Sequence, residues 1–223
     1  MNFEPFILSF KLAALTSAIL FVISLPLAWY LARTQTRLKP FLEALTALPI
    51  VLPPSVLGFY LLWTFSTTSP IGSFLHDRFD IDLLFSFSGL VVASCIYSLP
   101  FMIQPLQNGF ESLNPHMLEA SYLAGKTTLQ TIIHVALPNM KPALITAIII
   151  TFAHTVGEFG VVLMVGGNIE GETKVASVAI YEMVEIMDYS NAHIYSGVMV
   201  ALSFVILLSV YSFNAHQKQK VLM

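Results

Sequence analysis

Five long apolar segments constrain the fold of this chain more than any other feature of its sequence. A helix needs about 20 mostly apolar residues to cross the hydrocarbon core of a bilayer. Segments of this kind occur at residues 6–32, 41–66, 83–106, 140–166 and 194–213. Only 10% of the 223 residues are charged, whereas a soluble domain has about 25%. We therefore predict an all-α, polytopic bundle of about five transmembrane helices, forming one domain over residues 6–213.

The basic residues predict how these helices are oriented. They cluster after the first span, between the third and fourth, and after the last, at Arg33, Arg37, Lys39, Lys126, Lys141, Lys218 and Lys220. The other two loops are mainly acidic. Because lysine and arginine concentrate on the cytoplasmic side, we predict a multi-pass protein of the plasma or bacterial inner membrane, surrounded by lipid. Its N-terminus lies outside, its C-terminus and the 107–139 connection in the cytoplasm.

The segment at 140–166 carries a ridge of small residues and two ionisable ones. The small residues recur every four positions, at Ala143, Ala147, Thr151 and Thr155. Such a ridge lets two helices approach closely, either within the chain or between two copies. His154 and Glu158 are also four apart and can meet on a helix. Since ionisable groups are costly in a bilayer, they form either a structural pair or part of a transport path or gate.

The predicted cytoplasmic connection contains Gly125-Lys126-Thr127, which resembles the end of a nucleotide-binding P-loop. However, the first glycine of that motif would fall at Ala120, and no buried strand precedes it. The sequence therefore does not predict an ATP-binding site here.

Helix signals explain the same stretch better. Asn114 is a favourable N-cap, and Pro115 suits the first helical position. Gly125 suits the left-handed residue that ends a helix, and a second short helix would run on to Pro138. Two short helices joined at a glycine form either a rigid knob that transmits the motion of a cytoplasmic partner or an amphipathic connector on the membrane surface. The pattern alone leaves both open.

The stretch "EASYLAGKTTLQTIIHVALP" resembles the loop signature of ABC importer permeases, E-A-A-x-x-x-G-x₉-I-x-L-P. The matching residues are Glu119, Ala120, Gly125, Leu137 and Pro138. Ser121 and Val135 replace the third small residue and the isoleucine. The resemblance implies a type I ABC importer permease fold, in which the 115–137 loop is the coupling helix that docks on an ATP-binding subunit. It implies that this chain is a transport subunit, not an enzyme, without catalytic residues, metal or cofactor.

Three further stretches resemble molybdate permeases: "GEFG" at 157–160, "GGNIEGET" at 166–173 and "LPIVLPPSVLGFYLL" at 48–62. The resemblance implies import of molybdate, with tungstate indistinguishable from it. Sulfate or thiosulfate permeases have a similar glycine–acid–aromatic–glycine stretch and are the alternative. We expect path or gate residues at His154, Gly157, Glu158, Gly160 and Thr173. Many molybdate permeases have an arginine at the position of His154.

The stretch at 48–62 contains Pro49, Pro53 and Pro54, which we expect to bend or break the second span.

The resemblance also implies the partners: a second copy of the chain, two ATP-binding cassette subunits on the cytoplasmic side, and an extracytoplasmic molybdate-binding protein on the other side. The outer loop at 167–193 is acidic, and it either pairs with basic residues of that binding protein or is a solvated loop. We expect no nucleic-acid partner.

Two other classes of function fit the sequence less well. A secondary transporter without ATP would need more intramembrane charge for ion coupling, and only Glu43, His154 and Glu158 are candidates. A membrane-embedded enzyme needs several His, Asp or Glu side chains at one depth, but the six histidines are scattered.

The single cysteine, Cys95, lies in an apolar run and is expected to pack there.

Overall fold

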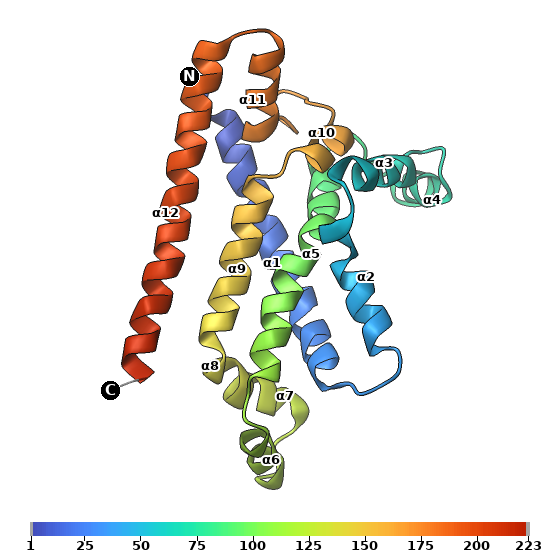
Figure 1. Ribbon diagram of the computed structural model, residues 1–223. Coiled ribbons are helices and arrows are strands. Elements are labelled where there is room, and N and C mark those ends of the chain that lie inside the picture. Colours follow the sequence, from blue (N-terminus) through green and yellow to red (C-terminus); the bar gives the residue numbers. More distant parts are fainter. Residues whose placement is uncertain (1, 222–223) are drawn as a thin grey trace.

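The computed structural model describes residues 2–221, with side chains described up to Ser209 and at Ser212. Within that range every regular element is a helix, as predicted (Figure 1). In chain order they are α1 (Glu4–Arg33), α2 (Lys39–Val51), α3 (Pro54–Phe65), α4 (Pro70–Phe79), α5 (Phe87–Glu111), α6 (Pro115–Leu123), α7 (Thr128–Thr131), the π-helix η1 (Ile132–Ala136), α8 (Leu137–Asn139), α9 (Lys141–Val156), α10 (Gly160–Gly166), α11 (Ala176–Glu185) and α12 (Tyr189–Val221).

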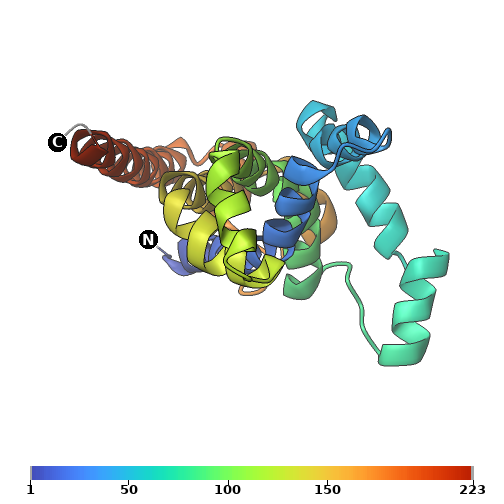
Figure 2. The same cartoon turned by 90° about the horizontal axis from the view of Figure 1, so that it is seen from below.

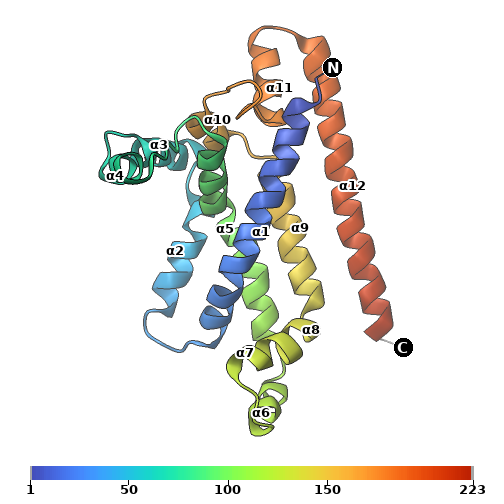
Figure 3. The same cartoon turned by 180° about the vertical axis from the view of Figure 1, so that it is seen from behind.

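Helices α1, α5 and α9 pack together as the centre of the molecule (Figures 1 and 3). Their shared core includes Leu20, Met102 and Phe110, all at most 1% exposed. α5 and α9 approach closely, because a Cβ atom at Gly109 would lie 2.6 Å from the Cβ atom of Ala143. The small-residue ridge of the fourth segment therefore packs within the chain, which answers the question that the sequence left open.

Among the described residues, three helices are long and apolar enough to cross a membrane: α1, α5 and residues 189–209 of α12. They coincide with the predicted segments at 6–32, 83–106 and 194–213, although α5 continues to Glu111. The number of spans rises to as many as five if two pairs of helices, each bent at a short break, count as one span each. These pairs are α2 with α3, and the segment 128–139 (α7 to α8) with α9.

The second segment, 41–66, is broken rather than continuous, with a bend of 106° between α2 and α3. The break falls at Leu52 and Pro53, whose ψ angles of 133° and 136° are extended. A residue that precedes a proline is disfavoured in the α conformation, and Pro53 and Pro54 impose this restriction twice in succession. Pro49 lies inside α2 without ending it.

The fourth segment, 140–166, is not one helix either, which corrects the sequence-based expectation. α9 ends at Val156 with Gly157 as its cap, and α10 begins at Gly160. α10 packs on α3, where a Cβ atom at Gly160 would lie 2.8 Å from the Cβ atom of Pro54. This contact places the chain between α9 and α10 beside the break in the second segment.

The two ends of the bundle differ. The N-terminus and α11 lie at the end opposite α6, whereas the C-terminal end of α12 lies toward the α6 end (Figure 1). Viewed from the α6 end, α12 and α4 lie on opposite sides of the central helices (Figure 2). Only 11% of the residues in the most apolar stretch of α12 are buried, compared with 56% of those in the most apolar stretch of α5. α12 is thus a peripheral helix.

Candidate functional site

The helices from α6 to α8 form a knob at one end of the bundle (Figure 1). The side chain of Asn114 accepts a hydrogen bond from the His116 backbone N–H at 3.0 Å, so it caps α6 as predicted. Gly125 has φ +76°, the left-handed conformation that glycine adopts without strain. Thr127 then begins α7 with a capping box that includes Gln130.

The knob packs against the bundle, and its own helices are joined to each other. Leu118 is 4% exposed and packs in the same core as Phe110. The Ser121 and Thr131 hydroxyls form a buried hydrogen bond of 2.9 Å that joins α6 to α7. Ser121 is the residue that departs from the signature, and its hydroxyl supplies this link. These contacts make the knob part of the folded bundle.

The second half of the knob does not stop at Pro138, as the sequence suggested, but continues to Asn139. Its π-helix is closed by the Leu137 backbone N–H, which donates to the Ile132 carbonyl. Proline lacks an N–H and crowds the preceding turn of a helix, and a wide π turn just before Pro138 tolerates this. The chain then bends by 83° between Asn139 and Lys141 into α9.

Most residues of the loop signature point outward. Glu119, Ala120, Gly125 and Pro138 are exposed, and Leu137 is half-buried. The Glu119 carboxylate lies 3.2 Å from His116 Nδ1. Apolar side chains are exposed beside them, with Leu123 at 90% and Leu129 at 66%. The knob thus presents an apolar surface with a carboxylate at its edge.

A cavity of about 490 Å³ lies where the two broken segments meet. It is lined by Pro54, Tyr97, Ala153, His154, Gly157, Glu158, Phe159 and Gly160. The structure therefore brings together four of the five predicted path residues, at the ends of α3, α9 and α10 and beside α5.

Glu158 has an unusual environment in this cavity. It is only 5% exposed, and its carboxylate makes no close hydrogen bond among the described residues, with the Ser94 hydroxyl and the Val162 backbone N–H as weaker polar neighbours. Its backbone carbonyl, by contrast, accepts a hydrogen bond from the Ser177 hydroxyl. Buried polar groups are normally satisfied. A buried carboxyl without a close hydrogen bond, in the lining of a cavity, is a candidate for a function there.

His154 does not pair with Glu158, which corrects the expected His–Glu contact. α9 ends at Val156, so the four-residue spacing no longer places both side chains on one helix face. Instead, His154 Nδ1 lies 3.1 Å from the Ser98 hydroxyl. Its ring stacks on Phe101, with the ring centroids 3.8 Å apart.

Thr173 has a structural position outside this cavity. Its buried hydroxyl donates to the Gly166 carbonyl at 2.7 Å and accepts from the Ile169 N–H at 2.9 Å. These bonds close the loop between α10 and α11.

The sequence did not predict a role for Tyr97 and Phe101, which pack around His154. Their four-residue spacing in an apolar segment was the one available signal, and it does not separate a cavity wall from ordinary core.

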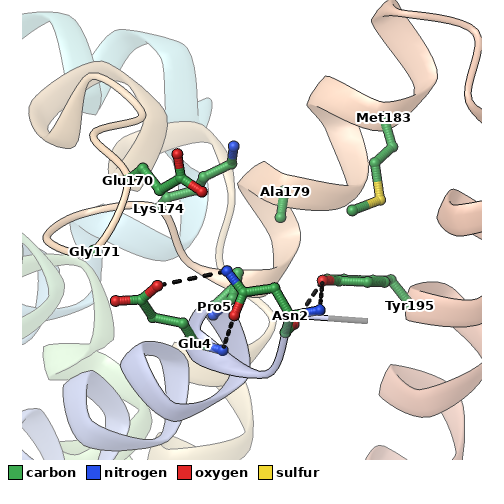
Figure 4. Close-up of a pocket in the computed structure, with 9 residues that line it drawn as sticks. All are labelled: Asn2, Glu4, Pro5, Glu170, Gly171, Lys174, Ala179, Met183 and Tyr195. Carbon is green, nitrogen blue, oxygen red and sulfur yellow. Dashed lines mark hydrogen bonds between the residues drawn. The ribbon is translucent and has the colours of Figure 1, made fainter.

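The end of the molecule opposite the knob has a small cleft of about 130 Å³ (Figure 4). The Tyr195 hydroxyl of α12 donates to the Asn2 carbonyl at 2.6 Å and so ties α12 to the start of α1. Lys174 lines the cleft and forms an ion pair with Glu182 of α11. α11 lies within the acidic loop at 167–193.

The sequence matches a family described as "Binding-protein-dependent transport system inner membrane component" over residues 24–222. That range includes the knob and the cavity. The chain belongs to this family. It is therefore a multi-pass permease component of the inner membrane, and the prediction of an ABC importer permease is confirmed.

Two relatives and one solved structure define the likeness further. The chain is 49% identical over 205 residues to the molybdenum transport system permease protein ModB of Azotobacter vinelandii, covering 92% of this chain and 91% of the relative. It is 34% identical over 200 residues to the sulfate transport system permease protein CysT of Salmonella typhimurium, covering 90% and 72%. Its fold resembles that of the MetNI methionine ABC transporter in inward-facing conformations, with TM-score 0.70, 19% identity, and 92% and 91% coverage.

Proposed function

We propose that this chain is the membrane-spanning subunit of an ATP-driven importer that moves molybdate into the cytoplasm. The observation that carries the proposal is the 49% identity to a molybdenum permease along 92% of the chain. Tungstate, a tetrahedral oxyanion of nearly the same size, is expected to use the same path. Sulfate is the second candidate, supported by the 34% identity to a sulfate permease.

The energy for import comes from a separate ATPase subunit that docks on the knob. The exposed apolar residues Leu123 and Leu129 support this role, because an exposed apolar patch on a folded element is typical of a contact surface. When ATP closes the ATPase dimer, the 115–137 loop moves with it and the bundle opens outward. Hydrolysis then returns the bundle to the inward-open state.

The assembly contains two copies of this chain, two ATPase subunits and one binding protein. The ATPases occupy the α6 end, which is cytoplasmic and also holds the C-terminal end of α12. The binding protein docks at the other end, near α11 and the N-terminus. It delivers the anion toward the cavity around His154 and Glu158, where weak binding favours onward release.

Two substitutions test the docking role of the knob. Glu119→Lys reverses an exposed charge, and Gly125→Pro cannot adopt the observed φ of +76°. Both variants should fold in the membrane but lose ATP-driven uptake. Normal uptake in either variant would exclude the proposed docking surface.

Transport itself is tested in proteoliposomes that contain this chain with its ATPase and binding protein. Radiolabelled molybdate is supplied with ATP at the ATPase side, and tungstate and sulfate are added separately as competitors. Competition by tungstate alone supports the proposal, and competition by sulfate alone assigns the chain to sulfate transport. Uptake that persists without ATP or without the ATPase would exclude an ABC importer.

A further inference from the structure

The central helix α5 exposes two polar side chains that no contact among the described residues explains. Gln104 and Asn108 lie within the membrane-spanning helix and are exposed. Neither side-chain amide has a hydrogen-bond partner among the described residues. Polar groups are costly in contact with lipid, and in membrane proteins they face water, a ligand or another helix.

Both amides line a second cavity, of about 320 Å³, between α2 and α5. Its lining consists of Glu43, Thr46, Ala47, Gln104, Gln107 and Asn108. The cavity lies closer to the knob than the cavity around Glu158, because α5 runs from Phe87 toward the knob (Figure 1). Glu43 was the one lining residue that the sequence singled out, as an ionisable group of the second span.

The two cavities share one face of α5. Tyr97, Phe101, Gln104 and Asn108 follow a 4-3-4 spacing, which places them along a single stripe of a helix. At 1.5 Å per residue the stripe extends about 16 Å. Tyr97 and Phe101 contact His154 at the first cavity, and the two amides open on the second. Phe101, whose ring stacks on His154, therefore lies between the two cavities along α5.

The charges near the second cavity are already paired. Lys39 Nζ lies 3.2 Å from Glu111 Oε1 and 3.6 Å from Glu43 Oε1. Gln107 Nε2 donates to Glu43 Oε1 at 2.7 Å and to Glu111 Oε1 at 3.0 Å. This network occupies Gln107 and leaves a net negative charge beside the cavity, because a single lysine faces two carboxylates. The free donors in the described lining are then the neutral amides of Gln104 and Asn108.

We propose that this cavity is a second subsite on the transport path, where the Gln104 and Asn108 amide N–H groups bind a tetrahedral oxyanion after it passes Phe101. The oxyanion class rests on the function proposed above. Neutral amides donate hydrogen bonds to the anion's oxygens, while the nearby carboxylates of Glu43 and Glu111 oppose long residence. A subsite of this kind holds the anion transiently on its way to the cytoplasm.

The experiment measures thiol accessibility in the complete reconstituted transporter, in a Cys95→Ser background. Gln104→Cys and Asn108→Cys probe the stripe. Val92→Cys and Ile96→Cys are matched controls, since both are exposed apolar positions on the same helix but on another face. The probe is a membrane-impermeant, sulfonate-bearing methanethiosulfonate reagent, applied in nanodiscs so that both sides are accessible, and each variant is first checked for uptake.

The stripe positions should react much faster than the controls. Molybdate at about four times its Kd should slow their labelling about fivefold, following the factor 1 + [L]/Kd. Fast labelling that neither molybdate nor sulfate slows would overturn the subsite. Disulfide formation between two copies at these positions, without labelling, would also overturn it by making the stripe a subunit contact. Protection by sulfate alone would keep the subsite and reject molybdate as substrate.

Discussion

At the residue scale, Glu158 is the side chain whose environment is hardest to explain by stability. A buried carboxyl without a close hydrogen bond costs free energy, whether it is charged or neutral. Residues that depart from the usual pairing of buried polar groups tend to occur at functional sites. His154, in contrast, has two close partners, the Ser98 hydroxyl and the Phe101 ring.

We expect Glu158→Gln to keep the stability of the bundle but to lower uptake by about tenfold, which corresponds to about 1.4 kcal/mol at the rate-limiting step. The amide has nearly the same size and is cheaper to bury than an unpartnered carboxylate. Thermal unfolding in detergent and ATP-driven uptake are the two measurements.

Thr151→Val is the matched control for that prediction. The Thr151 hydroxyl is also buried without a partner, but it lies on the ridge of α9 and not in the cavity. This variant should keep both stability and uptake. Equal loss of uptake in the two variants would mean that Glu158 has no special role.

At the element scale, the molecule is organised by breaks in its helices. The proline pair ends α2 and starts α3, and Gly157 ends α9. The two breaks meet where Gly160 packs on Pro54, and the cavity with Glu158 lies there. Broken helices free backbone groups inside a membrane, which is tolerated where they line a cavity.

Gly160→Ala should destabilise this junction by about 1–3 kcal/mol, because the added Cβ atom would lie 2.8 Å from Pro54 Cβ. Gly197→Ala is the control, since nothing lies within 4 Å of a Cβ atom there. In the middle of α12, alanine should be neutral or stabilising by up to about 1 kcal/mol. Melting temperatures of the two variants in the same detergent check the sign of each effect.

The α6–α7 link gives a second prediction at this scale. Ser121→Ala alone, or Thr131→Val alone, leaves one buried hydroxyl unsatisfied and should cost about 1–3 kcal/mol of local stability. The double variant removes both hydroxyls and should recover most of the loss. Hydrogen exchange of the α6 amides measures the local stability. Additive losses in the double variant would contradict a direct bond between the two residues.

At the scale of the whole molecule, the N-terminus and the knob lie at opposite ends, and the C-terminal end of α12 lies toward the knob (Figure 1). This arrangement agrees with the charge pattern, in which the basic loops share one side. The three central helices carry the core, and the peripheral helices α2, α3 and α12 leave apolar side chains exposed, such as Val51, Trp63 and Val200. Those surfaces are available to lipid and to a second copy.

The orientation is tested with single cysteines in the Cys95→Ser background. Asn2→Cys should react with a membrane-impermeant maleimide in intact cells. Lys126→Cys should react only after the membrane is permeabilised, because loops rich in lysine and arginine are expected in the cytoplasm. The reverse pattern of labelling would invert the topology proposed for the chain.

The sequence by itself determined the helical membrane fold, the knob with its Asn114 cap and Gly125 turn, and the permease family. These features depend on local propensity and on the length of apolar runs, which act within a few turns of chain. Only the tertiary structure decided that His154 bonds to Ser98 rather than to Glu158, and that Thr173 closes a loop. It alone brought Pro54, Tyr97 and Glu158 to one cavity, because contacts between distant segments depend on where helices break and how they pack.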